Sequence, residues 1–144
     1  LFGITGMTLG LMSYFKDRPK VVVNLKWDMK IIGDPNRKPD EFAGMVTVAN
    51  VGRRPIYLSH VALRLPKCAG HGYMILQEGI SGNKLAEGDP PKIFTINHSE
   101  MVKGLQEEIK KQPGLWKHIR AQVTDSAGKN YLSNRVKEKP SWAK

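Results

Sequence analysis

The chain has 144 residues, of which 40% are hydrophobic and 25% are charged. This composition excludes an intrinsically disordered chain and fits one folded domain with short appendages. The 23 Lys and Arg residues outnumber the 13 Asp and Glu residues, and the net charge of +10 favours anionic partners such as lipid head groups, nucleic acid or an acidic protein. A solvated basic surface without a partner is the alternative explanation. The single cysteine, Cys68, excludes an internal disulfide bond.

The chain starts with an uncharged segment, residues 1–15, and a basic stretch, residues 16–20, follows it directly. We interpret residues 1–15 as a membrane-anchor helix and residues 16–20 as a basic stop and linker. A spanning helix needs about 20 apolar residues, so we expect the anchor to be truncated. The first residue is Leu rather than Met, which indicates a fragment or a processed form. The residues predicted to enter the membrane are Leu9, Leu11, Met12, Tyr14 and Phe15.

Two alternatives for residues 1–15 are a remnant of a signal peptide and a buried helix or strand of the folded domain. If the segment is an anchor, the basic residues after it place the rest of the chain in the cytoplasm by the positive-inside rule. The predicted location is therefore the membrane, with a cytoplasmic domain. Gly6 and Gly10 have the GxxxG spacing that lets two helices approach closely, so self-association through them is a further hypothesis.

The body of the chain, residues 21–134, is predicted to be rich in β-strands. In residues 21–31 the odd positions are hydrophobic and the even positions are mostly polar, which is the period of a half-buried strand. Further strands are expected at residues 42–51, 56–65, 73–77, 92–97, 116–124 and 129–134. Glycine and proline mark the longer connections, residues 33–40 and 79–91.

One short helix is expected between these strands. Ser99 resembles an N-cap, the apolar residues Val102, Leu105 and Ile109 follow at helical spacing, and the helix is expected to end at Lys111. About seven strands with one inserted helix predict an antiparallel β-sandwich. Residues 135–144 complete the chain as a basic tail.

Two segments resemble a known class of domain. Residues 46–58, Val-Thr-Val-Ala-Asn-Val-Gly-Arg-Arg-Pro-Ile-Tyr-Leu, resemble the V-x-N-x-G-x-x-P-V strand–turn–strand of bacterial immunoglobulin-like sandwich domains. Residues 123–131 resemble their closing hairpin. The layout, with F-x-D-R-P at residues 15–19, is similar to uncharacterised bacterial and phage single-span membrane proteins. The resemblance implies an immunoglobulin-like fold preceded by an apolar helix, and it implies no catalytic residues.

Motifs for catalysis and for metal or cofactor binding are missing from the sequence. Cys68 and His71 have a metal-like spacing and His60 precedes them, but a zinc site normally needs four ligands. The residues around Cys68 match no signature of a cysteine nucleophile, and no phosphate-binding or dinucleotide-binding glycine motif occurs. We therefore predict no metal, no cofactor and no catalytic residues, and hence not an enzyme.

The predicted function is a membrane-anchored, non-catalytic interaction module on the cytoplasmic face, which binds a protein partner or forms part of a membrane complex. The alternatives are a basic nucleic-acid-binding protein and, less favoured, an unrecognised enzyme that uses Cys68. The predicted partners are membrane lipid at the N-terminal segment and a protein of unknown identity. The surface expected to meet an anionic partner consists of Lys16, Arg18, Lys20, Arg53, Arg54, Lys110, Lys111, Arg135, Lys137 and Lys139.

Overall fold

The computed structural model describes residues 2–16, 20–33, 35, 36, 38, 41–66, 73–77 and 83–143. In chain order its elements are α1 (Phe2–Lys16), β1 (Val21–Lys30), β2 (Phe42–Asn50), β3 (Ile56–Arg64), β4 (Tyr73–Gln77), β5 (Asn83–Leu85), β6 (Lys92–Asn97), α2 (His98–Gly104), α3 (Gln106–Lys111), the 3-10 turn η2 (Leu115–His118), β7 (Arg120–Asp125), β8 (Asn130–Leu132) and the 3-10 turn η3 (Ser141–Ala143).

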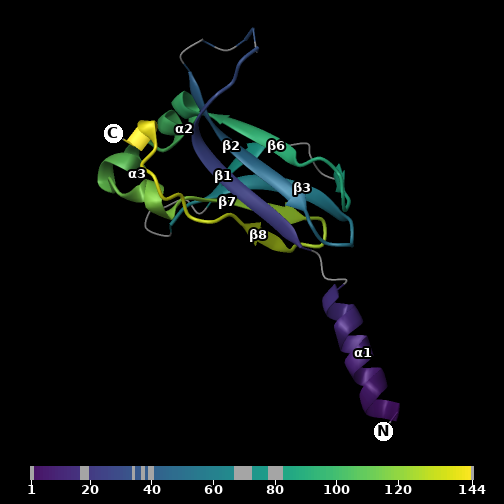
Figure 1. Cartoon of the computed structure of the whole chain (residues 1–144). Helices are drawn as coiled ribbons and strands as arrows, with labels where there is room; N and C mark the ends of the chain where they lie inside the picture. Colours follow the sequence, from purple (N-terminus) through teal and green to yellow (C-terminus); the bar gives the residue numbers. More distant parts are fainter. Residues whose placement is uncertain are drawn as a thin grey trace.

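The strands form two antiparallel sheets (Figure 1). The first sheet has the order β1-β2-β6, and the second has the order β4-β3-β7-β8, with β5 paired to the beginning of β3. The predicted mainly β fold is confirmed at this level: two antiparallel sheets with a few short helices. β5 was not predicted, because it lies within residues 79–91, where glycine and proline indicated only a turn.

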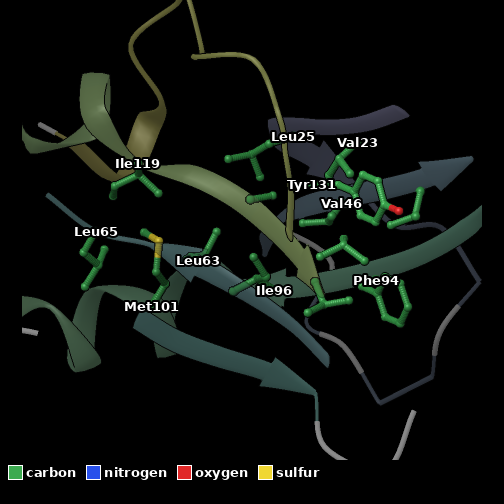
Figure 2. Close-up of a cluster of buried hydrophobic side chains, with 14 of the residues drawn as sticks. Val23, Leu25, Val46, Leu63, Leu65, Phe94, Ile96, Met101, Ile119 and Tyr131 are labelled. Carbon is green, nitrogen blue, oxygen red and sulfur yellow. The ribbon is translucent and has the colours of Figure 1, made fainter. Parts of the chain in front are cut away.

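A single hydrophobic core lies between the two sheets. Figure 2 shows Val46 and Ile96 of the first sheet and Leu63 of the second sheet among the buried side chains. In β1 the odd residues from Val23 to Trp27 are buried and the even residues are exposed, as the alternation predicts. The predicted helix is broken in two at Leu105, which has φ −115° and a side chain that is only 1% exposed. Met101 of α2 and Leu105 at the break are both buried in the core.

A bulge interrupts the pairing of β1 with β2. Lys26 pairs with Met45 and Met29 pairs with Ala43, so the two residues Trp27 and Asp28 lie opposite Gly44 alone. Asp28 has φ +59°, a left-handed conformation that Asp tolerates better than most residues. The ring of Trp27 lies on Gly44, where a Cβ would come within 2.5 Å of Cζ3. The bulge therefore depends on glycine at position 44.

Buried polar side chains fix the two turns that the sequence predicted. Asn50 Nδ2 donates to the carbonyl oxygens of Arg54 and Leu85, 2.8 Å each, and Gly52 N donates to Asn50 Oδ1 at 2.9 Å. In the β7–β8 hairpin, Tyr131 donates from its hydroxyl to Asp125 Oδ2 at 3.0 Å. Burial together with this hydrogen bond raises the pKa of Tyr131 to about 12.

The N-terminal segment forms α1, but it does not support a membrane anchor. α1 has 15 residues, a length of about 22 Å at 1.5 Å per residue, against about 30 Å for a hydrocarbon core. No helix in the described part of the chain has the length and hydropathy needed to cross a bilayer. The predicted membrane location with a cytoplasmic domain is therefore wrong.

The predicted anchor residues can be placed only in part. Leu9, Leu11 and Met12 are 65%, 47% and 56% exposed on α1. Tyr14 and Phe15 belong to the same helix, but their side chains lie outside the described residues. Self-association through Gly6 and Gly10 stays a prediction.

Candidate anion-binding pocket

The predicted basic surface is dispersed over the molecule. Arg53 and Arg54 lie in the turn between β2 and β3, at the end of the β domain nearest α1, whereas α3, with Lys110 and Lys111, lies at the opposite end (Figure 1). Arg135 and two further basic residues of the predicted surface lie in the segment after β8, and Lys20 precedes β1. The side chain of Lys16 and the whole of Arg18 lie outside the described residues. The described residues of this predicted surface therefore lie on separate parts of the molecule.

Basic side chains do gather at one pocket, which has a volume of ≈ 270 Å³. Its lining consists of Arg64, Leu65, Pro66, His118, Arg120 and Arg135. Three arginines and one histidine thus line the pocket, and no acidic residue is among its described lining residues. Such a lining attracts anions.

Three secondary-structure elements and the segment after β8 bring these side chains together. Arg64 is the last residue of β3 and Arg120 is the first residue of β7, and the two face each other directly across the strand pair. Like charges at directly opposite positions destabilise a sheet by repulsion. His118 ends the 3-10 turn that leads into β7, and Arg135 comes from the segment after β8.

A hydrogen bond to the backbone holds Arg120 in place. Arg120 Nε donates to the carbonyl oxygen of Ser133 at 2.7 Å. Ser133 is itself fully buried, and it is fixed by two bonds to Ala121, one from Ala121 N to Ser133 Oγ and one from Ser133 N to the Ala121 carbonyl, both 2.9 Å. A guanidinium held in one plane is suited to two-point binding of phosphate or carboxylate oxygens.

A second polar cluster joins the C-terminal segment to the bulge. Ser141 N donates to both carboxylate oxygens of Asp28 at 3.1 Å, and the Ser141 hydroxyl donates to the same carboxylate. His98 Nδ1 lies 3.8 Å from Asp28 Oδ1, and Asp28 N donates weakly to His98 Nε2 at 3.4 Å. A catalytic triad needs the serine hydroxyl to meet the histidine. Here the hydroxyl is held by the aspartate, so the cluster anchors the segment after β8.

His98 makes stability depend on pH near neutrality. Burial lowers its pKa below 6.5, and Asp28 and Glu41 oppose this only partly. The unfolded chain therefore takes up this proton first as the pH falls through about 6.5, and we expect the free energy of unfolding to decrease there. Urea denaturation of the wild type and H98Q between about pH 7 and pH 5 measures this. An equal decrease in both proteins would contradict the assignment to His98.

The predicted absence of a metal stays a prediction. Within the described residues, no group of three or more His, Cys, Asp or Glu side chains is placed to hold a metal ion. Cys68 and His71 lie outside the described residues. His60 lies in β3, with Nδ1 3.4 Å from Ser59 Oγ.

Of the basic residues that line the pocket, only Arg135 was among the predicted site residues. Arg64, His118 and Arg120 were missed because their proximity depends on the register of β3 with β7, which pairs residues 56 positions apart in the sequence. The sequence offered one signal for the pocket, the position of Arg64 on the polar side of its strand, next to a turn.

Comparison of the chain with protein-family models, curated proteins and solved structures finds no match.

Proposed function

We propose that this chain is a non-catalytic β-sandwich interaction module that binds an anionic group of a protein partner in the pocket of Arg64, Arg120 and Arg135. The observation that carries the proposal is the described lining of the pocket, which holds three arginines and a histidine and no acidic residue. Arg64 and Arg120 repel each other while no anion lies between them. A bound anion between the two guanidinium groups is attracted to both of them and offsets their repulsion. This is expected of a binding site and not of two residues with a purely structural role.

An immunoglobulin-like topology belongs to the same proposal. In that fold strands A, B and E share one sheet, and strands C, F and G share the other, with C′ strands beside C in some variants. The order β1-β2-β6 corresponds to A-B-E, and the order β4-β3-β7-β8 corresponds to C′-C-F-G. Domains of this class commonly bind other proteins through their edges and end loops, and the pocket lies at such an end.

A phosphoryl group is the anion that fits the pocket best. Its oxygens can be shared between two arginines, whereas one carboxylate is satisfied by a single guanidinium. Nucleic acid is the second candidate, since the charge of +10 favours it. Single strands are generally held by aromatic side chains beside a basic groove, and the described lining of this pocket contains no aromatic residue. The observations therefore favour a phosphorylated protein segment.

The test is the binding of phosphoserine with blocked amino and carboxyl ends. Isothermal titration calorimetry should detect binding to the wild type and at least about tenfold weaker binding to R64Q, a loss of about 1.4 kcal/mol. Without ligand, R64Q should be slightly more stable than the wild type, by about 0.2–1 kcal/mol, because the repulsion with Arg120 is removed. A variant that is more stable than the wild type but binds the ligand more weakly distinguishes a binding residue from a structural one.

The matched control is R53Q, which removes the same charge from an exposed position in the turn between β2 and β3. R53Q should bind blocked phosphoserine as the wild type does. Equal weakening in R53Q and R64Q would show that only the net charge matters and would reject the pocket. If a mixed-sequence oligonucleotide binds and blocked phosphoserine does not, the nucleic-acid alternative replaces this proposal.

A further inference from the structure

We infer that the partner segment is an extended peptide, which adds as a strand along the free edge of β1 and places its phosphorylated side chain in the pocket of Arg64, Arg120 and Arg135. This inference rests on the proposed function and specifies its ligand. It is based on a second hollow in the surface, which lies beside β1.

A groove of ≈ 410 Å³ runs beside β1. One wall is formed by the consecutive residues 25–29 of β1, and the other by the consecutive residues 135–138 of the segment after β8. Arg135 lines both this groove and the basic pocket, so the two hollows adjoin at that residue. A peptide backbone in the groove can therefore extend an anionic side chain past Arg135 into the pocket.

The edge of β1 that faces away from β2 is available for pairing. β1 is the terminal strand of its sheet and pairs with β2 only. In the described part of the chain, no backbone hydrogen bond joins β1 to residues 135–138. The segment after β8 therefore runs past the edge of β1 without completing the sheet, and an unpaired edge is a template for an added strand.

The register identifies the amides that an added strand would use. Val51 N donates to the carbonyl of Lys20 at 2.8 Å, so this pair is hydrogen-bonded. Hydrogen-bonded pairs alternate along an antiparallel ladder, so the even residues up to Lys26 direct their N–H groups toward β2. Val23 and Leu25 then direct their N–H groups outward, and Leu25 lines the groove. The bulge at Trp27 and Asp28 ends the regular ladder, so backbone pairing is confined to Val23 and Leu25. The peptide then continues without pairing past residues 27–29, which line the rest of the groove.

The segment after β8 is fixed well enough to act as a wall. Pro140 is fully buried, Val136 packs against the core, and Ser141 is bonded to Asp28. Trp142 packs edge-on against Trp27, with ring centroids 5.4 Å apart. These contacts hold the segment at both sides of residues 137–139, so the groove exists before a partner arrives and little ordering is needed on binding.

The experiment compares three probes on the full chain. The first is blocked phosphoserine, the second is a peptide of about nine residues with alternating Thr and Val around a central phosphoserine, and the third is the same peptide with N-methyl groups on alternate residues. We expect the unmethylated peptide to bind at least about tenfold more tightly than blocked phosphoserine, and the methylated peptide to lose this gain. Hydrogen exchange at Val23 and Leu25 should slow with the unmethylated peptide only.

Each outcome decides a different point. If blocked phosphoserine binds but the peptide binds no more tightly and exchange at Leu25 is unchanged, strand addition is rejected and the anion pocket stands. If the peptide and its methylated form bind equally, the added affinity does not come from backbone pairing, and the inference fails in the same way. If neither blocked phosphoserine nor the peptide binds, both the inference and the proposed function are rejected.

Discussion

G44A should lower the free energy of unfolding by about 3 kcal/mol, because the new methyl group has no space. A Cβ at position 44 would lie 2.5 Å from Cζ3 and 2.6 Å from Cε3 of Trp27. The indole cannot move away freely, since its ring packs against Trp142 at 5.4 Å and against His98 at 5.6 Å between centroids. The strain therefore has to be taken up by the bulge or by the C-terminal segment. Urea or guanidinium denaturation followed by fluorescence measures the loss.

G114A is the matched control. Gly114 has a negative φ of −86°, and a Cβ there would meet nothing within 4 Å, so we expect a change of less than about 0.5 kcal/mol. A second test replaces Trp27 by Leu in the G44A background. If the clash causes the loss, the double mutant should be less destabilised than the sum of the two single mutants. Additive losses, or a G44A protein as stable as the wild type, would contradict the packing of Trp27 on Gly44.

The strands were predictable because their signal is local. Alternation over residues 21–31 requires only neighbouring positions, and β1 follows it from Val21 to Trp27. The turns at Asn50 and at Asp125 were also predictable, since their geometry depends on residues a few positions away. The two antiparallel sheets follow from short strands without alternating helices.

The bulge and the pocket were not predictable, because they depend on contacts between distant residues. Trp27 needs Gly44 opposite it, and Asp28 needs Ser141, 113 positions away. Arg64 and Arg120 become neighbours only through the register of β3 with β7. The membrane prediction failed for another reason: it relied on the apolar composition of residues 1–15 although they are fewer than a span requires, and no described helix has the length and hydropathy to cross a bilayer.

N50A should be the second strongly destabilising substitution, with an expected loss of about 3 kcal/mol. Asn50 is only 5% exposed, and its side chain bonds to three backbone groups, the N–H of Gly52 and the carbonyls of Arg54 and Leu85. Alanine would leave all three without this partner, and a buried backbone group that loses its hydrogen bond costs about 1–3 kcal/mol. The expected total loss is smaller than the sum of the three separate costs, because the turn between β2 and β3 lies near solvent and water can replace part of the lost bonding.

The loss in N50A should have a local signature as well as a global one. The bond to Leu85 ties β5 to the turn after β2, so amide exchange in β5 should accelerate more than exchange in β7. N24A, at an exposed position on β1, is the control and should change stability by less than about 0.5 kcal/mol. Equal stability of N50A and N24A would mean that the Asn50 bonds do not hold the turn. Uniform acceleration over all strands would mean that the turn and β5 are not coupled through this side chain.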